Sequence, residues 1–135
     1  MIIDTHSHFI PEVLIDEFKK ENNLFKAHIV KKGDKKFIEH EEGFRYPLFK
    51  EFYDVDAKIN DLEKMGIDKA ILSPSPTVFF YWSMPEIARE VSRICNGWVY
   101  SFTKKYPEHF MSMGTLPMIN VEDSLSEFER IISKY

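Results

Sequence analysis

Apolar residues recur along the chain at two spacings, which predict strands and helices in turn. The first apolar segment, residues 2–6, opens with two isoleucines and is closed by Pro11, so we expect a strand followed by a short helix at about residues 12–20. Between residues 26 and 47, short apolar pairs alternate with two glycine-containing turn sequences. This segment is predicted to be a small antiparallel β insertion after the first helix.

Helical spacing returns beyond the insertion. Asp54 is a predicted N-cap and Gly66 a predicted C-terminal cap, so an amphipathic helix is expected between them. A buried strand is expected at residues 68–73, where prolines stop it. The long helix that follows begins with a capping-box pattern at Ser83 and Glu86, in which the glutamate would reach back to the serine amide.

The long helix keeps one apolar stripe over four turns and is expected to end before Pro107. A third strand is predicted at residues 110–116 and a third amphipathic helix after Asn120. The stripe of the long helix consists of Ile87, Val91, Ile94, Cys95, Trp98 and Phe102.

Three strand-helix units in succession predict an α/β fold with a parallel sheet and right-handed crossovers. Two architectures are compatible with such a sheet. A doubly wound sheet usually carries a glycine-rich first turn, but no glycine precedes Gly33. The other architecture is a (β/α)8 TIM barrel, of which these 135 residues would form the first three βα units, because a whole barrel typically needs about 250 residues.

Composition narrows the classes of partner. The chain has 18 Lys and Arg against 22 Asp and Glu and no long basic run, so a nucleic acid is not expected. The longest purely apolar run, residues 78–82, is far shorter than the ~20 residues of a membrane helix, so no membrane is expected either. The single cysteine, Cys95, allows no internal disulfide and favours a cytoplasmic location.

Asp4, His6 and His8 carry the candidate chemistry. Alternate residues of a strand share a face, so these side chains should project together near the carboxyl end of the first strand. Barrels place their active sites at that end. Two imidazoles at this spacing can converge on one divalent cation, although two unrelated polar residues would give the same pattern. The position on the first strand of the series favours a metal site, with Asp4 in support.

At these residues the sequence resembles a known family. Residues 4–11, Asp-Thr-His-Ser-His-Phe-Ile-Pro, are similar to the opening of the amidohydrolase superfamily. Further motifs are similar in order and spacing to its branch of α-amino-β-carboxymuconate-ε-semialdehyde decarboxylases, and the resemblance spans essentially the whole chain. These motifs lie at residues 65–70, 76–82, 96, 106–107 and 114–118.

The resemblance implies a metal-dependent barrel enzyme that decarboxylates an unsaturated or aromatic carboxylic acid, or hydrolyses a related substrate. It implies one divalent ion, with zinc the expected metal and with His6 and His8 as the two first-strand ligands. It also places the insertion near the mouth of the barrel and assigns Arg45 to a substrate carboxylate, for which a guanidinium is well suited. Phe79, in the aromatic run 79–82, is a candidate wall for a planar substrate, although such a run also serves packing.

The remaining parts of the family's site have no counterpart here. A histidine and an aspartate ligand and the general-base histidine would all lie beyond Tyr135, so no catalytic residue is assigned within the chain. Two imidazoles form an open site, and we expect this chain alone to bind zinc weakly and to have no turnover. Its unpaired strand edge would favour association with the missing barrel portion or a homo-oligomer. A non-catalytic α/β association module built on the same scaffold is the second hypothesis.

The other polar candidates have milder interpretations. His28, His40 and His109 stand alone among polar neighbours and are expected to be solvated. Cys95 lies on the apolar stripe without an adjacent basic residue, which predicts a buried, inert thiol rather than a nucleophile.

Overall fold

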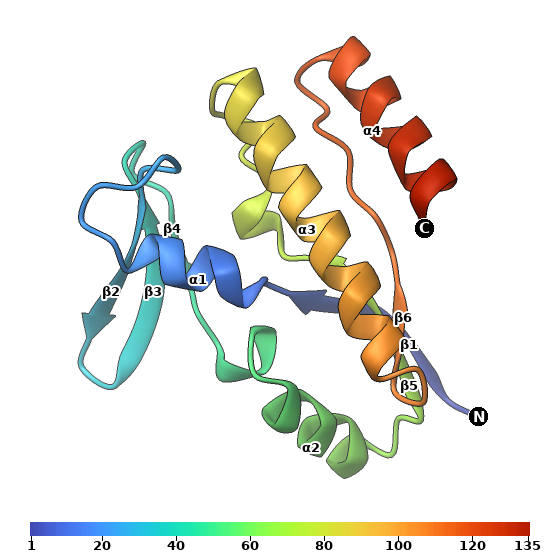
Figure 1. The fold of residues 1–135 in the computed structure, drawn as a ribbon. Coiled ribbons are helices and arrows are strands. Elements are labelled where there is room, and N and C mark those ends of the chain that lie inside the picture. Colours follow the sequence, from blue (N-terminus) through green and yellow to red (C-terminus); the bar gives the residue numbers. More distant parts are fainter.

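Two three-stranded sheets organise the chain in the computed structural model, which describes all residues from 1 to 135 (Figure 1). The first sheet is parallel, with the order β1-β5-β6, and is formed by β1 (Ile3–Phe9), β5 (Lys69–Pro74) and β6 (Phe110–Ser112). The second is antiparallel and contains β2 (Ala27–Lys32), β3 (Lys35–His40) and β4 (Arg45–Pro47). The predicted parallel sheet and the predicted antiparallel insertion after the first helix are therefore both confirmed.

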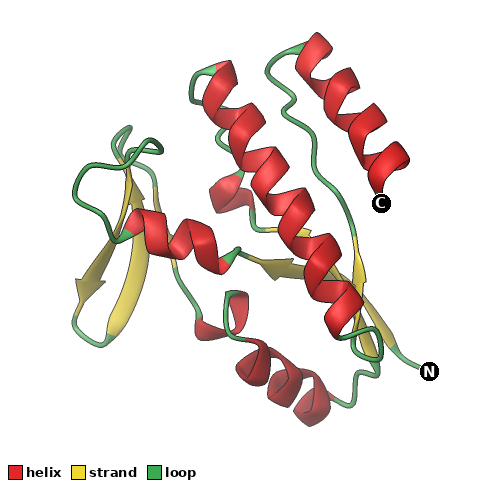
Figure 2. Ribbon diagram, viewed as in Figure 1, coloured by secondary structure: helices red, strands yellow, loops and turns green.

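Four α-helices connect and cover these strands, as Figure 2 shows. They are α1 (Glu12–Phe18), α2 (Val55–Met65), α3 (Pro85–Lys105) and α4 (Val121–Lys134), with 3-10 turns η1 (Lys50–Phe52) and η2 (Pro76–Val78). The predicted apolar stripe of α3 faces the parallel sheet, where the Trp98 ring stacks on Phe9 of β1 at 5.0 Å. Ala70 and Leu72 of β5 are fully buried in the same core. Burial of this apolar stripe holds the helix on the sheet.

The caps of α2 form as predicted, whereas the capping box of α3 does not. The Asp54 carboxylate accepts the Ala57 amide at 2.9 Å, and Gly66 ends α2 in the left-handed region with φ 69°. The N-cap of α3 is Met84, with ψ 148° and no side-chain cap bond, so the prediction for Ser83 is wrong. The reason is Pro85, which occupies the first helical position and favours extended backbone in the residue before it.

The third strand of the parallel sheet is shorter than predicted. β6 ends at Ser112 instead of residue 116, and the last ladder bond joins the Met113 amide to the Leu72 carbonyl at 2.8 Å. Beyond it, the Thr115 amide bonds to the Asn96 side chain of α3 at 2.8 Å. The Asn96 side chain thus takes the place of the backbone partner that a neighbouring strand would supply, and the chain turns away from the sheet.

Both edges of the parallel sheet lack a further strand, and one face of α4 is exposed. β1 and β6 each pair only with β5, so the outer edge of each is free. The apolar stripe of α4 is exposed at half or more of each side chain, namely Val121, Leu125, Phe128 and Ile132. Such a surface is typical of a face that packs against further polypeptide. No helix combines the length and the apolarity that a membrane crossing requires.

Candidate functional site

The imidazole rings of His6 and His8 meet at the carboxyl end of β1. Their centroids lie 4.7 Å apart with the planes at 77°, so the two side chains point to the same side, as strand alternation predicts. His6 is exposed and His8 is half-buried. Two ring nitrogens at this spacing can approach one small ligand from two directions.

A β-bulge lies in β1 between Asp4 and Ser7, and His6 is part of it. Asp4 is opposite Ala70, whereas Ser7 is already opposite Leu72, so β1 holds one residue more than β5 over this stretch. The Asp4 carboxylate accepts the His6 amide at 2.9 Å. Asp4 therefore restrains the backbone of the bulge.

His8 is held as a neutral imidazole by its surroundings. Burial lowers the pKa of His8, and the neighbouring His6 and Lys58 charges lower it further, against the opposing effect of backbone oxygens at Ser73 and Pro74. Nδ1 lies 3.3 Å from the Ser73 hydroxyl. When Nδ1 donates to this hydroxyl, Nε2 carries the lone pair, which is the usual arrangement of a metal-binding histidine.

Lys58 of α2 lies directly behind this strand. Its side chain is 9% exposed, and Nζ donates to the Ser7 hydroxyl at 3.0 Å. Burial lowers the pKa of Lys58, and the carboxylates of Asp4, Asp61 and Glu51 act in the opposite direction.

The sequence interpretation missed Lys58, although a pattern could have identified it. The residue lies three positions after Val55 and four before Leu62, on the apolar face of the predicted helix. A lysine on such a face is rarely buried unless its amine has a partner.

The donors present fit part of a metal site. No group of three or more His, Cys, Asp or Glu side chains lies close enough together to hold an ion. His6 and His8 supply two imidazole nitrogen donors, whereas a catalytic zinc usually has three protein ligands. The pair is therefore suited to be one side of a metal centre.

The structure places the two predicted substrate residues in other elements. Arg45 lies on β4, where Nε donates to the Glu39 carboxylate across the sheet at 2.5 Å and the side chain is 42% exposed. Phe79 follows η2 and stacks on Tyr81 at 5.1 Å. No hydrogen bond or ring contact joins either residue to the histidine pair, so their substrate roles rest on the resemblance.

The prediction that His40 is solvated is wrong. Its ring is 2% exposed and meets the rings of Phe80 and Trp82 edge-on at 5.0 and 5.1 Å. Both ring nitrogens and the Trp82 indole nitrogen lack a hydrogen-bond partner. Burial lowers the pKa of His40, with an opposing effect from Glu42. Strand alternation turns His40 inward together with Ile38. The polarity of its sequence neighbours, on which the prediction relies, does not indicate this burial.

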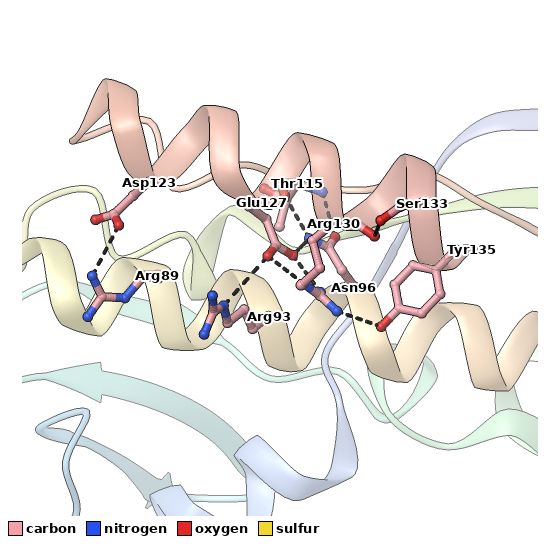
Figure 3. A network of polar contacts seen from close by, with 9 residues as sticks. All are labelled: Arg89, Arg93, Asn96, Thr115, Asp123, Glu127, Arg130, Ser133 and Tyr135. Carbon is pink, nitrogen blue, oxygen red and sulfur yellow. Dashed lines mark hydrogen bonds and ion pairs between the residues drawn. The ribbon is translucent and has the colours of Figure 1, made fainter.

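A second polar cluster, which the sequence interpretation also missed, joins α3 to α4 (Figure 3). Glu127 is 1% exposed, and its carboxylate accepts two bonds from Arg130 and one from the Asn96 amide at 2.6 Å. Asn96 also bonds to both the amide and the carbonyl of Thr115. Every polar group is paired here, so the cluster is an internal tie between the helices.

Solved structures with the same architecture define the class of fold. The chain matches IDCase from Metarhizium anisopliae in its apo form with a TM-score of 0.74 and 16% identity, over 96% of this chain and 39% of that one. It also matches the dihydroxybenzoic acid decarboxylase of Polaromonas sp. JS666, solved with manganese and the inhibitor 2-nitroresorcinol, with a TM-score of 0.66 and 23% identity, over 98% and 35%. The chain thus shares its fold with about a third or more of the length of these two structures.

Curated relatives make the resemblance more specific. The chain is 31% identical to 2-amino-3-carboxymuconate-6-semialdehyde decarboxylase of Dictyostelium discoideum over 59% of its length and 22% of the relative. It is 25% identical to the protein of the same name from Caenorhabditis elegans over 96% of its length and 33% of the relative. No family model matches the chain. The resemblance to this decarboxylase branch is confirmed, and the chain spans a third or less of the relatives' length.

Proposed function

We propose that the chain forms the first three βα units of a (β/α)8 barrel that acts as a metal-dependent decarboxylase on an unsaturated or aromatic carboxylic acid. The observation that carries this proposal is the meeting of the His6 and His8 rings, 4.7 Å apart, at the carboxyl end of the first parallel strand. This is the end at which barrels place their chemistry. The decarboxylase names of the relatives and of several structural neighbours support the same activity.

His6 and His8 would hold one divalent ion, for which we propose zinc. Such an ion supplies Lewis-acid chemistry and lowers the pKa of bound water. The chain's own contribution is to present two imidazoles, with the Ser73 hydroxyl fixing the ring of His8. The manganese in the Polaromonas decarboxylase supports a divalent ion in this class of fold.

Arg45 would bind the substrate carboxylate, with Phe79 as part of an apolar wall. The Arg45 guanidinium already binds a carboxylate, that of Glu39, in an exposed position. A substrate carboxylate would replace Glu39, and because the existing pair is solvated this exchange costs little. Decarboxylation fits better than hydrolysis because the relatives and several of the structural neighbours are named decarboxylases.

The third ligand and the general base would come from polypeptide that completes the barrel. We propose that the free edge of β6 and the exposed apolar face of α4 receive that portion, or a second copy in a homo-oligomer. The chain by itself would bind zinc weakly and show no turnover. The fully buried Cys95 thiol agrees with a cytoplasmic protein without structural disulfides.

Titration of the chain with Zn²⁺, followed by calorimetry, tests this proposal. One weak site per chain is expected, and His6→Ala or His8→Ala should abolish it, while His109→Ala serves as the matched control. Zinc binding that survives both substitutions would overturn the assignment. A chain that contains the completed barrel should release carbon dioxide, and Arg45→Ala should raise KM more than it lowers kcat because the guanidinium binds the carboxylate in the ground state.

The free edge of β6 and the exposed α4 face also favour the second candidate, a non-catalytic association module. That candidate predicts a defined oligomer without zinc binding. Sedimentation of the wild-type chain and of Leu125→Lys, in the presence and absence of Zn²⁺, separates the two. Leu125→Lys should dissociate a module, whereas the loss of His6 should leave it intact.

A further inference from the structure

Lys58 makes a buried contact that the proposed function does not use. Its Nζ donates to the Ser7 hydroxyl at 3.0 Å, between α2 and a strand 51 positions away in the sequence. An ammonium group carries three donors, and here only one is bonded to protein. Burial of a lysine with one partner is unfavourable in itself. The effect of the contact that could offset this cost is a restraint on the position of Ser7.

Ser7 lies between the two histidines, at the point where pairing between β1 and β5 resumes after the bulge. It is 8% exposed and opposite Leu72. Because successive side chains of a strand point to opposite faces, a Ser7 side chain held toward α2 turns His6 and His8 to the other side. A slip of one residue would turn both imidazoles inward toward the helix.

The bulge is therefore fixed at both ends. On one side the Asp4 carboxylate accepts the His6 amide at 2.9 Å, and on the other Lys58 holds Ser7. Asp4 is also the leading acidic charge acting on Lys58, so the two restraints support each other electrostatically.

We propose that Lys58 is a positioning residue, which fixes the β1 bulge through Ser7 so that the His6 and His8 rings converge on one ligand. This inference rests on the proposed metal-binding role of the pair. It assigns Lys58 no contact with metal or substrate. Its effect is instead on the order and register of residues 6–9.

The test compares Lys58→Met, Lys58→Arg and Ser7→Ala with Lys64→Met, an exposed lysine on the same helix. Methionine keeps the apolar stem and removes the donor, whereas arginine keeps a donor. Amide hydrogen exchange over residues 6–9 should become roughly tenfold faster in Lys58→Met and Ser7→Ala, with residues 110–112 of β6 unchanged. Lys58→Arg should restore slow exchange in large part, and Lys64→Met should behave as wild type.

The second measurement follows the ring proton signals of His6 and His8 by NMR during titration with Zn²⁺. Lys58→Met should weaken the response by roughly 10–100-fold, and adding Ser7→Ala should weaken it no further, because both act through one contact. Unchanged exchange in Lys58→Met, or exchange that rises equally in β1 and β6, would overturn the positioning role. If the wild-type rings do not respond to Zn²⁺, the proposed metal site fails, and the exchange data alone decide whether Lys58 orders the bulge.

Discussion

The His6 and His8 pair and the Glu127 cluster are both polar groups on a small α/β scaffold, but their surroundings are opposite. Glu127 is buried, and Arg130, Asn96 and Arg93 surround its carboxylate. The histidine rings lie at an exposed strand end, and each keeps a ring nitrogen without a protein partner in the hydrogen bonds observed. The Glu127 cluster has no free group that could bind a ligand, whereas the histidine pair has.

This difference separates a structural tie from the proposed binding site. A saturated buried network stabilises one packing of two helices, and removal of any member leaves its partners unpaired. The histidine pair, of which His6 is exposed and His8 half-buried, has free ring nitrogens and is expected to add less to folding than the saturated network. Substitutions at four positions extend this comparison, beginning with the largest expected effect on stability.

Glu127→Ala should destabilise the protein most. It leaves the partly exposed Arg130 guanidinium and one N–H of the buried Asn96 amide without their acceptor, and we expect a loss of about 3 kcal/mol in the free energy of unfolding. Urea denaturation measures this loss. Glu129→Ala, an exposed glutamate on the same helix, should change stability by less than about 0.5 kcal/mol. Equal effects of the two substitutions would show that the cluster does not tie α4 to α3.

Asn96→Ala should cost about 2 kcal/mol, because Thr115 loses both of its side-chain bonds and Glu127 loses one. Asn96→Asp sharpens the test. It places a second carboxylate where the amide now donates to Glu127 at 2.6 Å, so at neutral pH it should be at least as destabilising as alanine. Recovery of Asn96→Asp on mild acidification would identify the repulsion between carboxylates as the cause. An aspartate variant as stable as wild type at neutral pH would contradict the geometry of this contact.

The fold elements could be predicted where local rules act alone. The Asp54 cap, the Gly66 cap and the antiparallel insertion follow from turn chemistry and spacing within a few residues. The sequence predicts a third strand that is too long, because the end of β6 depends on Asn96. This residue lies on another element, and its side chain accepts the Thr115 amide. Contacts of this kind are invisible to periodicity.

The sequence predicts the two histidines of the candidate site but not the residues that hold them in place. Alternation predicts that His6 and His8 lie together, and they do so even though the strand bulges between Asp4 and Ser7, at His6 itself. Ser73 and Lys58 come from β5 and α2, so their contacts with His8 and Ser7 depend on how the sheet and helix pack. His40 was misjudged for the same reason, since its aromatic neighbours Phe80 and Trp82 lie 40 or more positions away.

His40 is an intermediate case between the two clusters, because it is buried and yet unpaired. Its pKa is lowered in the folded state by burial, so the unfolded chain binds more protons around the ordinary value of about 6.5. The stability contributed by the neutral ring is complete above that value and is lost as the pH falls through it. His40→Phe should remove this dependence, as judged by urea denaturation at about pH 7.5 and about pH 5.5. His109→Gln is the control and should retain the wild-type slope, and an unchanged slope in His40→Phe would contradict the prediction.

His6→Ala should have the smallest effect on stability and the clearest effect on binding. The side chain is exposed and makes no side-chain hydrogen bond, so its loss should change the free energy of unfolding by less than about 0.5 kcal/mol. Zinc that binds only the folded wild-type chain should raise its melting temperature in proportion to the logarithm of the zinc concentration. His6→Ala should abolish that rise. Glu127→Ala should lower the melting temperature but retain its rise with zinc. A zinc-dependent rise that follows Glu127 rather than His6 would reverse the assignment of the two clusters, because the saturated network would then be the one that accepts a ligand.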